Sequence, residues 1–455
     1  MQVSSRFRTR AILLVIALLL APSAALAGAK NVILLIGDGM GPSQVGAAWL
    51  YSTRVLHQNL RMVEVMKAGR TGYIVNDTAD SMVTESAAAA AQIATGVKMY
   101  ARALSMAADG KTPVKTILEM ARERGMATGL ATTSGITDAT PGAFSAHVAH
   151  RSDETSVADQ QLQGGVNVLL GGRKQFFLPE AAGGKRKDGR NLLEEARAAG
   201  YAVVGTAGEL QRAEGQKILG LFNMGNMAYE IDRSKTEEPS LAAMAAKTLD
   251  VLSRNPKGFF AMIEGGRIDH ASHRNDAAAT IQDTLAFDAA VGVALDFQRK
   301  HPDTLVIVTA DHETGGMALI GHSKDSKEYT GMDLPLLQKA KGSMELLAAR
   351  LGKDPTPERI RQEVRDTLAV ELTEDEAKTV AADTIRQLDP KNYSYPTLHS
   401  LAFVLRPYLR VGWGSQTHTA SPLMAFGVGP GSEALSGFLH NTELFGVMKT
   451  ALGLN

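Results

Sequence analysis

The sequence predicts an α/β fold with a central, mostly parallel sheet and helices on both faces. Two observations carry this prediction. Short, continuous apolar runs recur along the chain, at 31–39, 129–133, 166–172, 259–266, 304–312 and 423–429. Such runs are typical of strands buried on both faces. Each run is followed by Gly or polar residues and then by a helical stretch, an alternation that indicates parallel strands joined by crossover helices.

The first 27 residues have the pattern of a cleaved signal peptide. Three arginines precede an apolar run that ends in Ala25-Leu26-Ala27, so basic, apolar and small-residue regions follow in that order. The alternative is a membrane anchor, but a spanning helix needs about 20 apolar residues and this run is shorter. We therefore expect a periplasmic or secreted protein without a membrane span, whose residues 28–455 form a single α/β domain.

The "GDGMG" segment at 37–41 follows the first predicted strand. Glycines in that position are typical of a dinucleotide-binding loop. The spacing here is G-x-G-x-G, which differs from the G-x-G-x-x-G of that loop. Asp38 would also place an anion against the pyrophosphate, so a dinucleotide site is disfavoured.

The stretch "DSMVTESAAAAAQIATGVK", residues 80–98, holds two serines that each follow a carboxylate. Its alanines strongly favour a helix over 87–94, which Thr95-Gly96 ends. Ser86 then lies at the helix N-terminus, where free N–H groups and the dipole favour an alkoxide or a phosphate. Ser81 lies five residues earlier and lacks this support. The alternative is that Ser86 is only the N-cap, and the pattern alone leaves both interpretations open.

Acidic and imidazole side chains lie at the ends of three predicted strands. Asp38 follows the first strand, Glu264 lies near the end of 259–266, and Asp311 and His312 end 304–312. Carboxyl ends of such strands meet at one edge of the sheet. A single Asp there usually caps a helix, whereas several clustered anions need cations between them.

Further candidates can complete a metal site. Asp269 and His273 are four residues apart, which places them on one side of a helix, and His418 lies in a glycine-bearing loop. The chain has no cysteine, so the ligands must be His, carboxylates, hydroxyls or water. Asp/His sets suit zinc and all-oxygen sets suit magnesium, although a single His is more often structural.

Residues 321–400 depart from the strand–helix alternation and predict a helical insertion. Thr356-Pro357 reads as an N-cap followed by Pro at the first helical position, and Thr373 with Glu376 forms a capping box. These signals predict two charged amphipathic helices. From about residue 401 the chain is expected to return to the sheet.

The charge balance excludes one class of partner. The chain carries 48 basic and 48 acidic side chains. A basic excess is the usual mark of a nucleic-acid-binding protein, so no nucleic-acid partner is expected.

Six segments, taken in chain order, resemble the motifs of the alkaline phosphatase family. They span residues 31 to 420, apart from the insertion, and read "VILLIGDGMG", "VTESAAAAAQIATGVK", "DATPGAFSAHVAHR", "IEGGRIDHASH", "VIVTADHETGG" and "THTA". The resemblance implies an exported phosphomonoesterase with two Zn²⁺ and one Mg²⁺, small phosphorylated substrates and a homodimer.

The resemblance also implies a role for each candidate residue. Ser86 corresponds to the serine that becomes phosphorylated, and Arg151 to the arginine that binds phosphate. The implied ligands are Asp38, Asp311 and His312 for the zinc beside the serine, Asp269, His273 and His418 for the second zinc, and Thr140 and Glu264, with Asp38 bridging, for magnesium. Asp138 and His270 correspond to auxiliary positions near magnesium and phosphate.

The chain departs from the familiar bacterial pattern at Glu85, where Asp is usual. That carboxylate helps to position the arginine, so one more methylene can change how Arg151 is held. Asp138 and His270 are variable positions in the family, and Trp413 is expected either to border the pocket or to be a buried loop residue.

Two other functions compete with a phosphomonoesterase. A phosphodiesterase or sulfatase would share the metals, but Arg151, Thr140 and Glu264 favour a dianionic monoester. A phosphate- or metal-binding protein without turnover would need no nucleophile, so Ser86 distinguishes it from an enzyme.

Overall fold

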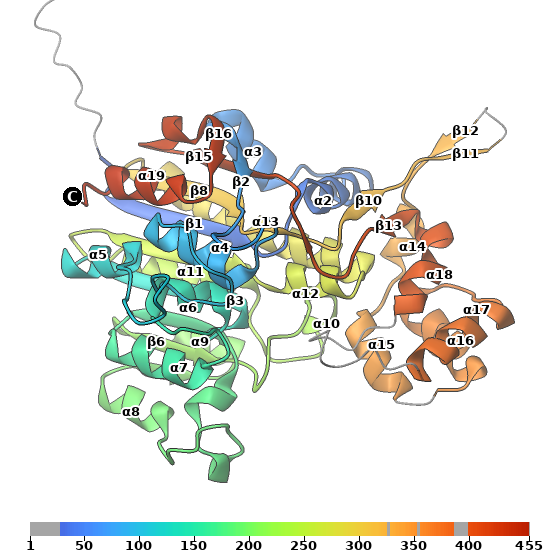
Figure 1. Cartoon of the computed structure of the whole chain (residues 1–455), viewed down its shortest axis with the longest axis horizontal. Coiled ribbons are helices and arrows are strands. Elements are labelled where there is room, and N and C mark those ends of the chain that lie inside the picture. Colours follow the sequence, from blue (N-terminus) through green and yellow to red (C-terminus); the bar gives the residue numbers. More distant parts are fainter. Residues whose placement is uncertain (1–27, 325–327, 353–354, 386–398, 455) are drawn as a thin grey trace, which may run out of the picture.

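The computed structural model describes residues 28–324, 328–352, 355–385 and 399–454. A ten-stranded sheet forms its centre (Figure 1), with the order β16-β2-β15-β8-β1-β7-β3-β4-β6-β5. Its strands are β1 (Asn31–Gly37), β2 (Arg70–Val75), β3 (Ala127–Gly135), β4 (Val168–Gly172), β5 (Ala202–Val204), β6 (Ile218–Leu221), β7 (Phe259–Gly265), β8 (Thr304–Ala310), β15 (Leu423–Val428) and β16 (Gly437–His440). Only β15 pairs antiparallel with its neighbours, so the mostly parallel α/β sheet is confirmed.

All six predicted strands form, and three of them carry the candidate residues side by side. β1 lies between β7 and β8, with Gly37 opposite both Gly265 and Ala310. The predicted segments miss β2, β5, β6 and β16. β5 is only half-buried and β2 alternates between exposed and buried positions, so neither has the long apolar run that marks a central strand.

Helices cover both faces of the sheet, as expected (Figure 1). One layer contains α2 (Pro42–Arg54), α3 (Arg61–Ala68), α11 (Leu241–Leu252), α12 (Arg267–His273) and α13 (Ala277–Lys300). The other contains α4 (Ser86–Thr95), α5 (Ile117–Glu123), α6 (Ala139–Ser145) and α19 (Glu443–Ala451). Towards the β5 edge lie α7 (Glu154–Gln163), α8 (Leu192–Ala198) and α9 (Ala207–Arg212), whereas α10 (Glu230–Arg233) packs against α13. Of the described helices, α13 alone is long and apolar enough to span a bilayer, and most of it is buried within the fold.

The alanine-rich helix α4 is completely enclosed. Every residue from Ser86 to Thr95 is buried, and α4 packs closely against α6 and α19. Gly96 ends the helix with a φ of 74°, a left-handed conformation that favours glycine. Small side chains let neighbouring backbones approach, which explains the run of alanines.

The predicted insertion forms a separate cluster of helices beside the sheet (Figure 1). It contains α14 (Leu334–Gln338), α15 (Met344–Leu351), α16 (Pro357–Leu368), α17 (Glu374–Ile385) and α18 (His399–Leu409), with a small hairpin of β11 (His322–Lys324) and β12 (Glu328–Thr330). The caps at Thr356 and Thr373 form as expected. Leu401 and Leu405 pack in the core of this cluster, so the chain returns to the sheet only after Leu409, later than the expected residue 401.

Two short strand pairs tie the cluster to the end of β8. β10 (Met317–Leu319) pairs with β13 (Val411–Trp413), and β9 (Glu313–Thr314) pairs with β14 (His418–Thr419). The second pair brings His418 beside the residues that follow β8. The predicted signal peptide, residues 1–27, lies outside the described residues.

Candidate active site

Two aspartates and one histidine meet where β1 and β8 end. His312 Nε2 lies 3.4 Å from Asp38 Oδ1 and 3.3 Å from Asp311 Oδ2. All three side chains are buried, and their ligand atoms are close enough to share one metal ion. The adjacent parallel strands end at the same level of the sheet, which explains the convergence.

A second group forms around the C-terminal turn of α12. His273 Nε2 lies 3.1 Å from His418 Nε2 and 3.4 Å from Asp269 Oδ2. The ring of His418 stacks on that of His312, with centroids 3.8 Å apart. The two predicted zinc groups are therefore neighbours in space.

The facing imidazoles of the second group call for a cation. His273 Nδ1 lies 2.6 Å from the carbonyl oxygen of Gln416, and His418 Nδ1 lies 3.0 Å from that of Thr84. Since a carbonyl only accepts, each Nδ1 carries a hydrogen, and each Nε2 is the ring atom that faces the other histidine. Burial and the nearby His312 lower the pKa of His418 to about 3, which keeps its ring neutral. Two imidazole Nε2 atoms that face each other at 3.1 Å are well placed to bind a shared positive ion.

Three buried carboxyl groups lead to the same conclusion for the other ligands. Asp38 Oδ1, Asp311 Oδ2 and Glu264 Oε2 have no hydrogen-bond partner among the described residues. Burial and mutual repulsion raise the pKa of Asp311 to about 7 and that of Glu264 to about 8, and that of Asp38 also rises well above its usual range. Clustered, desolvated carboxylates of this kind are stabilised by a metal ion. The donors therefore fit the metals that the resemblance implies.

Thr140 lies beside Glu264, as the magnesium set requires. It is buried on α6, and its hydroxyl, with that of Thr132, opposes the rise in the pKa of Glu264. Carboxylate and hydroxyl oxygens are the ligands that magnesium prefers. The structure thus brings Thr140, Glu264 and Asp38 to one region.

Ser86 is the first residue of α4, and its side chain faces the first metal group. Its Oγ lies 3.2 Å from His312 Nε2, and only 4% of the residue is exposed. The N-cap is Glu85, whose carboxylate accepts hydrogen bonds from the N–H groups of Ala87 and Ala88. The alternative in which Ser86 merely caps the helix is therefore wrong.

The Glu85 carboxylate also forms an ion pair with Arg151. Arg151 Nη1 lies 2.7 Å from Glu85 Oε2, and the N–H of Arg102 also donates to this carboxylate. Burial alone would raise the pKa of Glu85, but Arg151 and the N–H donors outweigh it and hold the pKa at about 2. The Glu85 carboxylate thus contacts both the start of α4 and Arg151.

Arg151 is held on its other side by Asp138. Its Nη2 lies 3.0 Å from Asp138 Oδ1, and Arg173 Nη2 lies 2.8 Å from Asp138 Oδ2. Arg173 also binds Glu154 at 2.8 Å. Glu85, Arg151, Asp138, Arg173 and Glu154 thus form a row of alternating charges that fixes the direction of Arg151.

Sequence reasoning missed Arg173. The residue directly follows β4 in a left-handed conformation, with a φ of 60°. Its place after a buried strand was a usable signal, because the other site residues share it. However, nothing in the sequence around Arg173, which follows a Gly-Gly pair, predicts its contact with Asp138.

His270 lies on α12, one residue after Asp269. Its Nδ1 is 2.9 Å from Arg267 Nη1. Burial and this arginine lower the pKa of His270 to about 3, so the ring is neutral. A neutral imidazole nitrogen can accept a hydrogen bond from a guanidinium N–H. His270 therefore accepts a hydrogen bond from Arg267 and helps to orient it.

The whole described chain matches one protein family. The family model for alkaline phosphatase covers residues 29–454. Alkaline phosphatase 4 of Bacillus subtilis is 35% identical over 92% of this chain and 89% of its own length. Alkaline phosphatase of Escherichia coli is 37% identical over 62% of this chain and 70% of its own.

A solved structure agrees with the sequence comparisons. The crystal structure of Thermus thermophilus alkaline phosphatase superposes with a TM-score of 0.86 and 34% identity. The match covers 94% of this chain and 92% of that one. Long coverage in both directions means that sheet, helices and insertion are compared together. The chain therefore belongs to the alkaline phosphatase family and is a hydrolase.

Proposed function

We propose that this enzyme hydrolyses phosphate monoesters through a phosphoserine at Ser86, in a site that binds two Zn²⁺ and one Mg²⁺. The observation that carries the proposal is the position of Ser86 Oγ. It lies at a helix N-terminus, 3.2 Å from His312 Nε2. Three buried carboxylate oxygens in the same region, Asp38 Oδ1, Asp311 Oδ2 and Glu264 Oε2, have no hydrogen-bond partner among the described residues. A binding protein without turnover needs no such nucleophile.

The metal ligands divide into three sets. Asp38, Asp311 and His312 would hold one zinc, and Asp269, His273 and His418 the other. Thr140 and Glu264, with Asp38, would hold magnesium. When bound, such ions lower the pKa of a nucleophile and neutralise charge on attacking and leaving oxygens.

The chain's own residues account for the course of the reaction. Ser86 loses its proton and Oγ bonds to phosphorus, while the ester P–O bond breaks and the alcohol leaves with a proton. Water then attacks the phosphoserine, the bond to Oγ breaks, and Ser86 regains a proton as phosphate leaves. Throughout, the two Nη groups of Arg151 donate to non-bridging oxygens, and Glu85 and Asp138 hold that arginine in place.

The charge of the site favours monoesters over diesters or sulfate esters. A monoester dianion has two negative charges to neutralise, which suits a site that combines Arg151 with three cations. p-Nitrophenyl phosphate is therefore expected to be hydrolysed faster than bis-p-nitrophenyl phosphate or p-nitrophenyl sulfate. Faster turnover of the diester would overturn this assignment.

The covalent intermediate gives the most direct test. Enzyme quenched with acid during turnover is expected to carry phosphate on the peptide that contains Ser86. Ser81 is an internal control, because it lies in the same stretch but is exposed and its Oγ accepts a hydrogen bond from the N–H of Val83. The variant S86A should lose the phosphoenzyme and S81A should keep it. Phosphate on Ser81, or full activity in S86A, would refute the mechanism.

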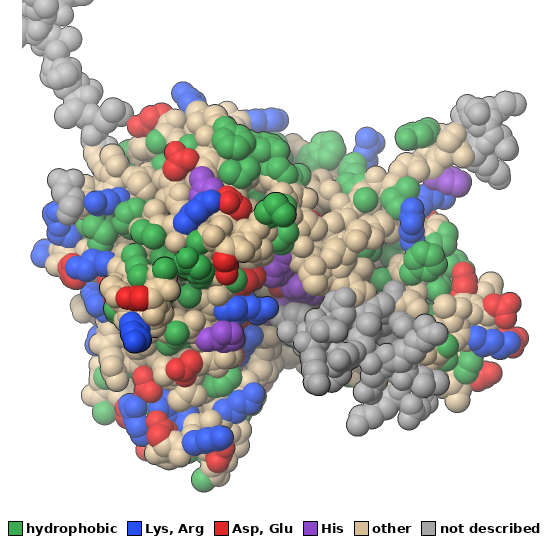
Figure 2. Space-filling model, in the orientation of Figure 1, with side chains coloured by type: hydrophobic (Ala, Val, Ile, Leu, Met, Phe, Trp, Pro, Cys, Tyr) green, Lys and Arg blue, Asp and Glu red, His purple; other side chains and the backbone are tan. Residues whose placement is uncertain are grey.

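We also propose export and assembly as a homodimer. Export rests on the signal-peptide pattern of residues 1–27, and N-terminal sequencing of the mature protein should begin at Gly28. The dimer is supported by exposed apolar side chains, since Figure 2 shows hydrophobic groups gathered on one face of the sheet domain. Among the exposed apolar side chains, Tyr73 and Phe438 stack with centroids 5.7 Å apart, and Met82 is 85% exposed. F438R and M82R should yield monomers in sedimentation, and a monomeric parent protein would refute the dimer.

A further inference from the structure

Helix α12 carries metal ligands on one side and arginines on the other. Each residue turns an α-helix by about 100°, so Asp269 and His273 lie on one face of α12. Arg267, the first residue of the helix, and Arg274, directly after its last, are two turns apart and share the opposite face. Because α12 has only seven residues, contacts with the rest of the fold must fix its direction.

One carboxylate binds both of these arginines. Glu345 Oε1 lies 2.9 Å from Arg267 Nη2, and Glu345 Oε2 lies 2.7 Å from Arg274 Nη2. The two arginine side chains are only 2% and 9% exposed, so water does little to screen their mutual repulsion. Glu345 supplies negative charge between them, and its carboxylate joins the two ends of α12.

The guanidinium groups are themselves held in place. That of Arg267 lies over the ring of Tyr229, with its Cζ 3.6 Å from the ring centroid, and donates to His270 Nδ1 at 2.9 Å. The hydroxyl of Tyr229 accepts a hydrogen bond from Arg274 Nε at 3.3 Å. Because neither arginine is free to reorient, the position of Glu345 bears directly on that of α12.

Glu345 belongs to the helical insertion, where it lies on α15. Its neighbour Met344 packs in the core of the insertion. The start of α15 is fixed to the sheet domain, because the N–H of Met344 donates to Asp276 at 2.6 Å and the N–H of Ser343 donates to Asp232 at 3.3 Å. Asp276 caps α13, the helix that follows α12. The insertion is therefore anchored beside α12, and Glu345 extends that anchor to the helix itself.

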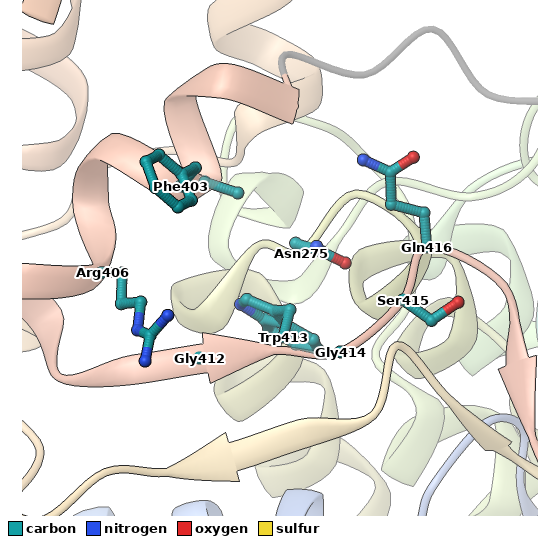
Figure 3. A pocket seen from close by; sticks show the side chains of 9 residues that line it. Asn275, Phe403, Arg406, Gly412, Trp413, Gly414, Ser415 and Gln416 are labelled. Atoms are coloured by element: carbon teal, nitrogen blue, oxygen red, sulfur yellow. The ribbon is translucent and has the colours of Figure 1, made fainter.

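Another helix of the insertion, α18, faces the end of α12 across a pocket. Figure 3 shows Phe403 and Arg406 of α18 on one side of this pocket, which has a volume of about 380 Å³, and Asn275 on the other. Trp413 also lines it. An open space thus separates α18 from the end of α12, whereas Glu345 contacts both ends of that helix directly.

We propose that Glu345 is a positioning residue that sets the zinc affinity of the group formed by Asp269, His273 and His418. The inference rests on the proposed function and gives the helical insertion a part in it. Removing a group that orients metal ligands from outside typically lowers metal affinity by about 10–100-fold. Glu345 acts one contact further out, through α12, so the lower end of this range, about tenfold, is expected.

Zinc release tests the proposal. Metal-loaded protein titrated with a chromophoric zinc chelator is expected to release two zinc ions, and the variant H273A, which lacks a ligand of the second group, identifies the release that belongs to that group. E345Q removes the charge at nearly constant size. It should bind the zinc of the second group about tenfold more weakly. The other zinc should keep its affinity, because Asp38, Asp311 and His312 follow β1 and β8 and do not lie on α12.

The selectivity for one zinc distinguishes positioning from a general loss of stability, which would weaken both sites. E371Q is the matched control, because it removes another ion pair of the insertion, between Arg365 Nε and Glu371 Oε1 at 2.6 Å. It should release both zinc ions as the parent does. Equal weakening of both sites in E345Q, or release identical to that of the parent, would overturn the inference.

Activity at saturating zinc gives a second test. Excess Zn²⁺ should restore the turnover of p-nitrophenyl phosphate by E345Q to the parent level, since the variant retains every proposed ligand. Turnover that stays low with both sites filled would overturn a role through zinc affinity. A parent protein that binds no zinc would instead refute the proposed function, whereas a parent that binds two zinc ions and releases them as E345Q does would refute only the role of Glu345.

Discussion

We predict that Glu85 contributes both to the stability of the fold and to the affinity for phosphate. Its carboxylate caps α4 through two N–H groups and binds Arg151 at 2.7 Å. E85A removes the cap, at a cost of about 1 kcal/mol. It also breaks a largely buried ion pair, which typically costs about 3–5 kcal/mol. Since Arg151 keeps Asp138 and its side chain is 22% exposed, we take the lower end for the ion pair, about 3 kcal/mol.

The expected total for E85A is therefore about 4 kcal/mol of unfolding free energy. E85D should separate the two contacts, because Asp is a good N-cap but, on the backbone of this chain, its carboxylate ends one methylene short of the position that Glu85 takes beside Arg151. Its free energy of unfolding should fall by about 1–2 kcal/mol, because one charge-assisted contact to the arginine is lost. For the same reason it should bind inorganic phosphate about tenfold more weakly.

Urea unfolding of the metal-loaded protein measures the stability, and competitive inhibition by inorganic phosphate measures the affinity. E119A is a matched control, because Glu119 also caps a helix and binds a basic side chain, His147, away from the site. It should lower stability without changing phosphate inhibition. An E85D protein as unstable as E85A, or phosphate inhibition unchanged in both, would refute this account of Glu85.

Three further outcomes are expected. Because Arg173 holds Asp138, R173A should weaken phosphate inhibition about tenfold and leave zinc content unchanged; normal inhibition would exclude a role in positioning Arg151. Burial would raise the pKa of Glu345, but Arg267 of α12 and Arg274, directly after that helix, hold it at about 2. Glu345 therefore stabilises the fold above its ordinary pKa of 4.5 and loses that effect as pH falls from about 4.5 to about 2. In chelator, the urea midpoint of E345Q should therefore fall less than that of the parent between pH 6 and pH 3, whereas the exposed-residue control E214Q should follow the parent. Chelation should abolish activity and lower Tm, since the clustered carboxylates lose their counter-charge, and zinc with magnesium should restore both; chelator-resistant turnover would contradict a metal mechanism.

Much of the candidate site could be predicted from local sequence patterns. The apolar runs predicted six strands of the sheet, and parallel strands end at a common edge, so Asp38, Glu264 and Asp311 were expected together. The alanine run predicted the helix that begins at Ser86. These inferences needed only the periodicity of side chains along the chain and the direction of each strand.

Other features depend on contacts between segments far apart in the chain. Arg173 meets Asp138 only because β4 lies beside β3, and its left-handed backbone cannot be read from its neighbours. The end of the helical insertion was misplaced for a similar reason. α18 has an apolar face like that of a sheet-covering helix, and only its packing against α17 assigns it to the insertion.

Local periodicity and chain direction were enough to predict the fold class, the edge of the sheet at which the candidate residues lie, and the helix that begins at Ser86. The tertiary structure decided which atoms meet. It placed the Nε2 atoms of His273 and His418 3.1 Å apart and brought the Glu85 carboxylate to both the start of α4 and Arg151. These pairings join residues separated by tens to hundreds of positions, and only the packed fold brings them within hydrogen-bonding distance.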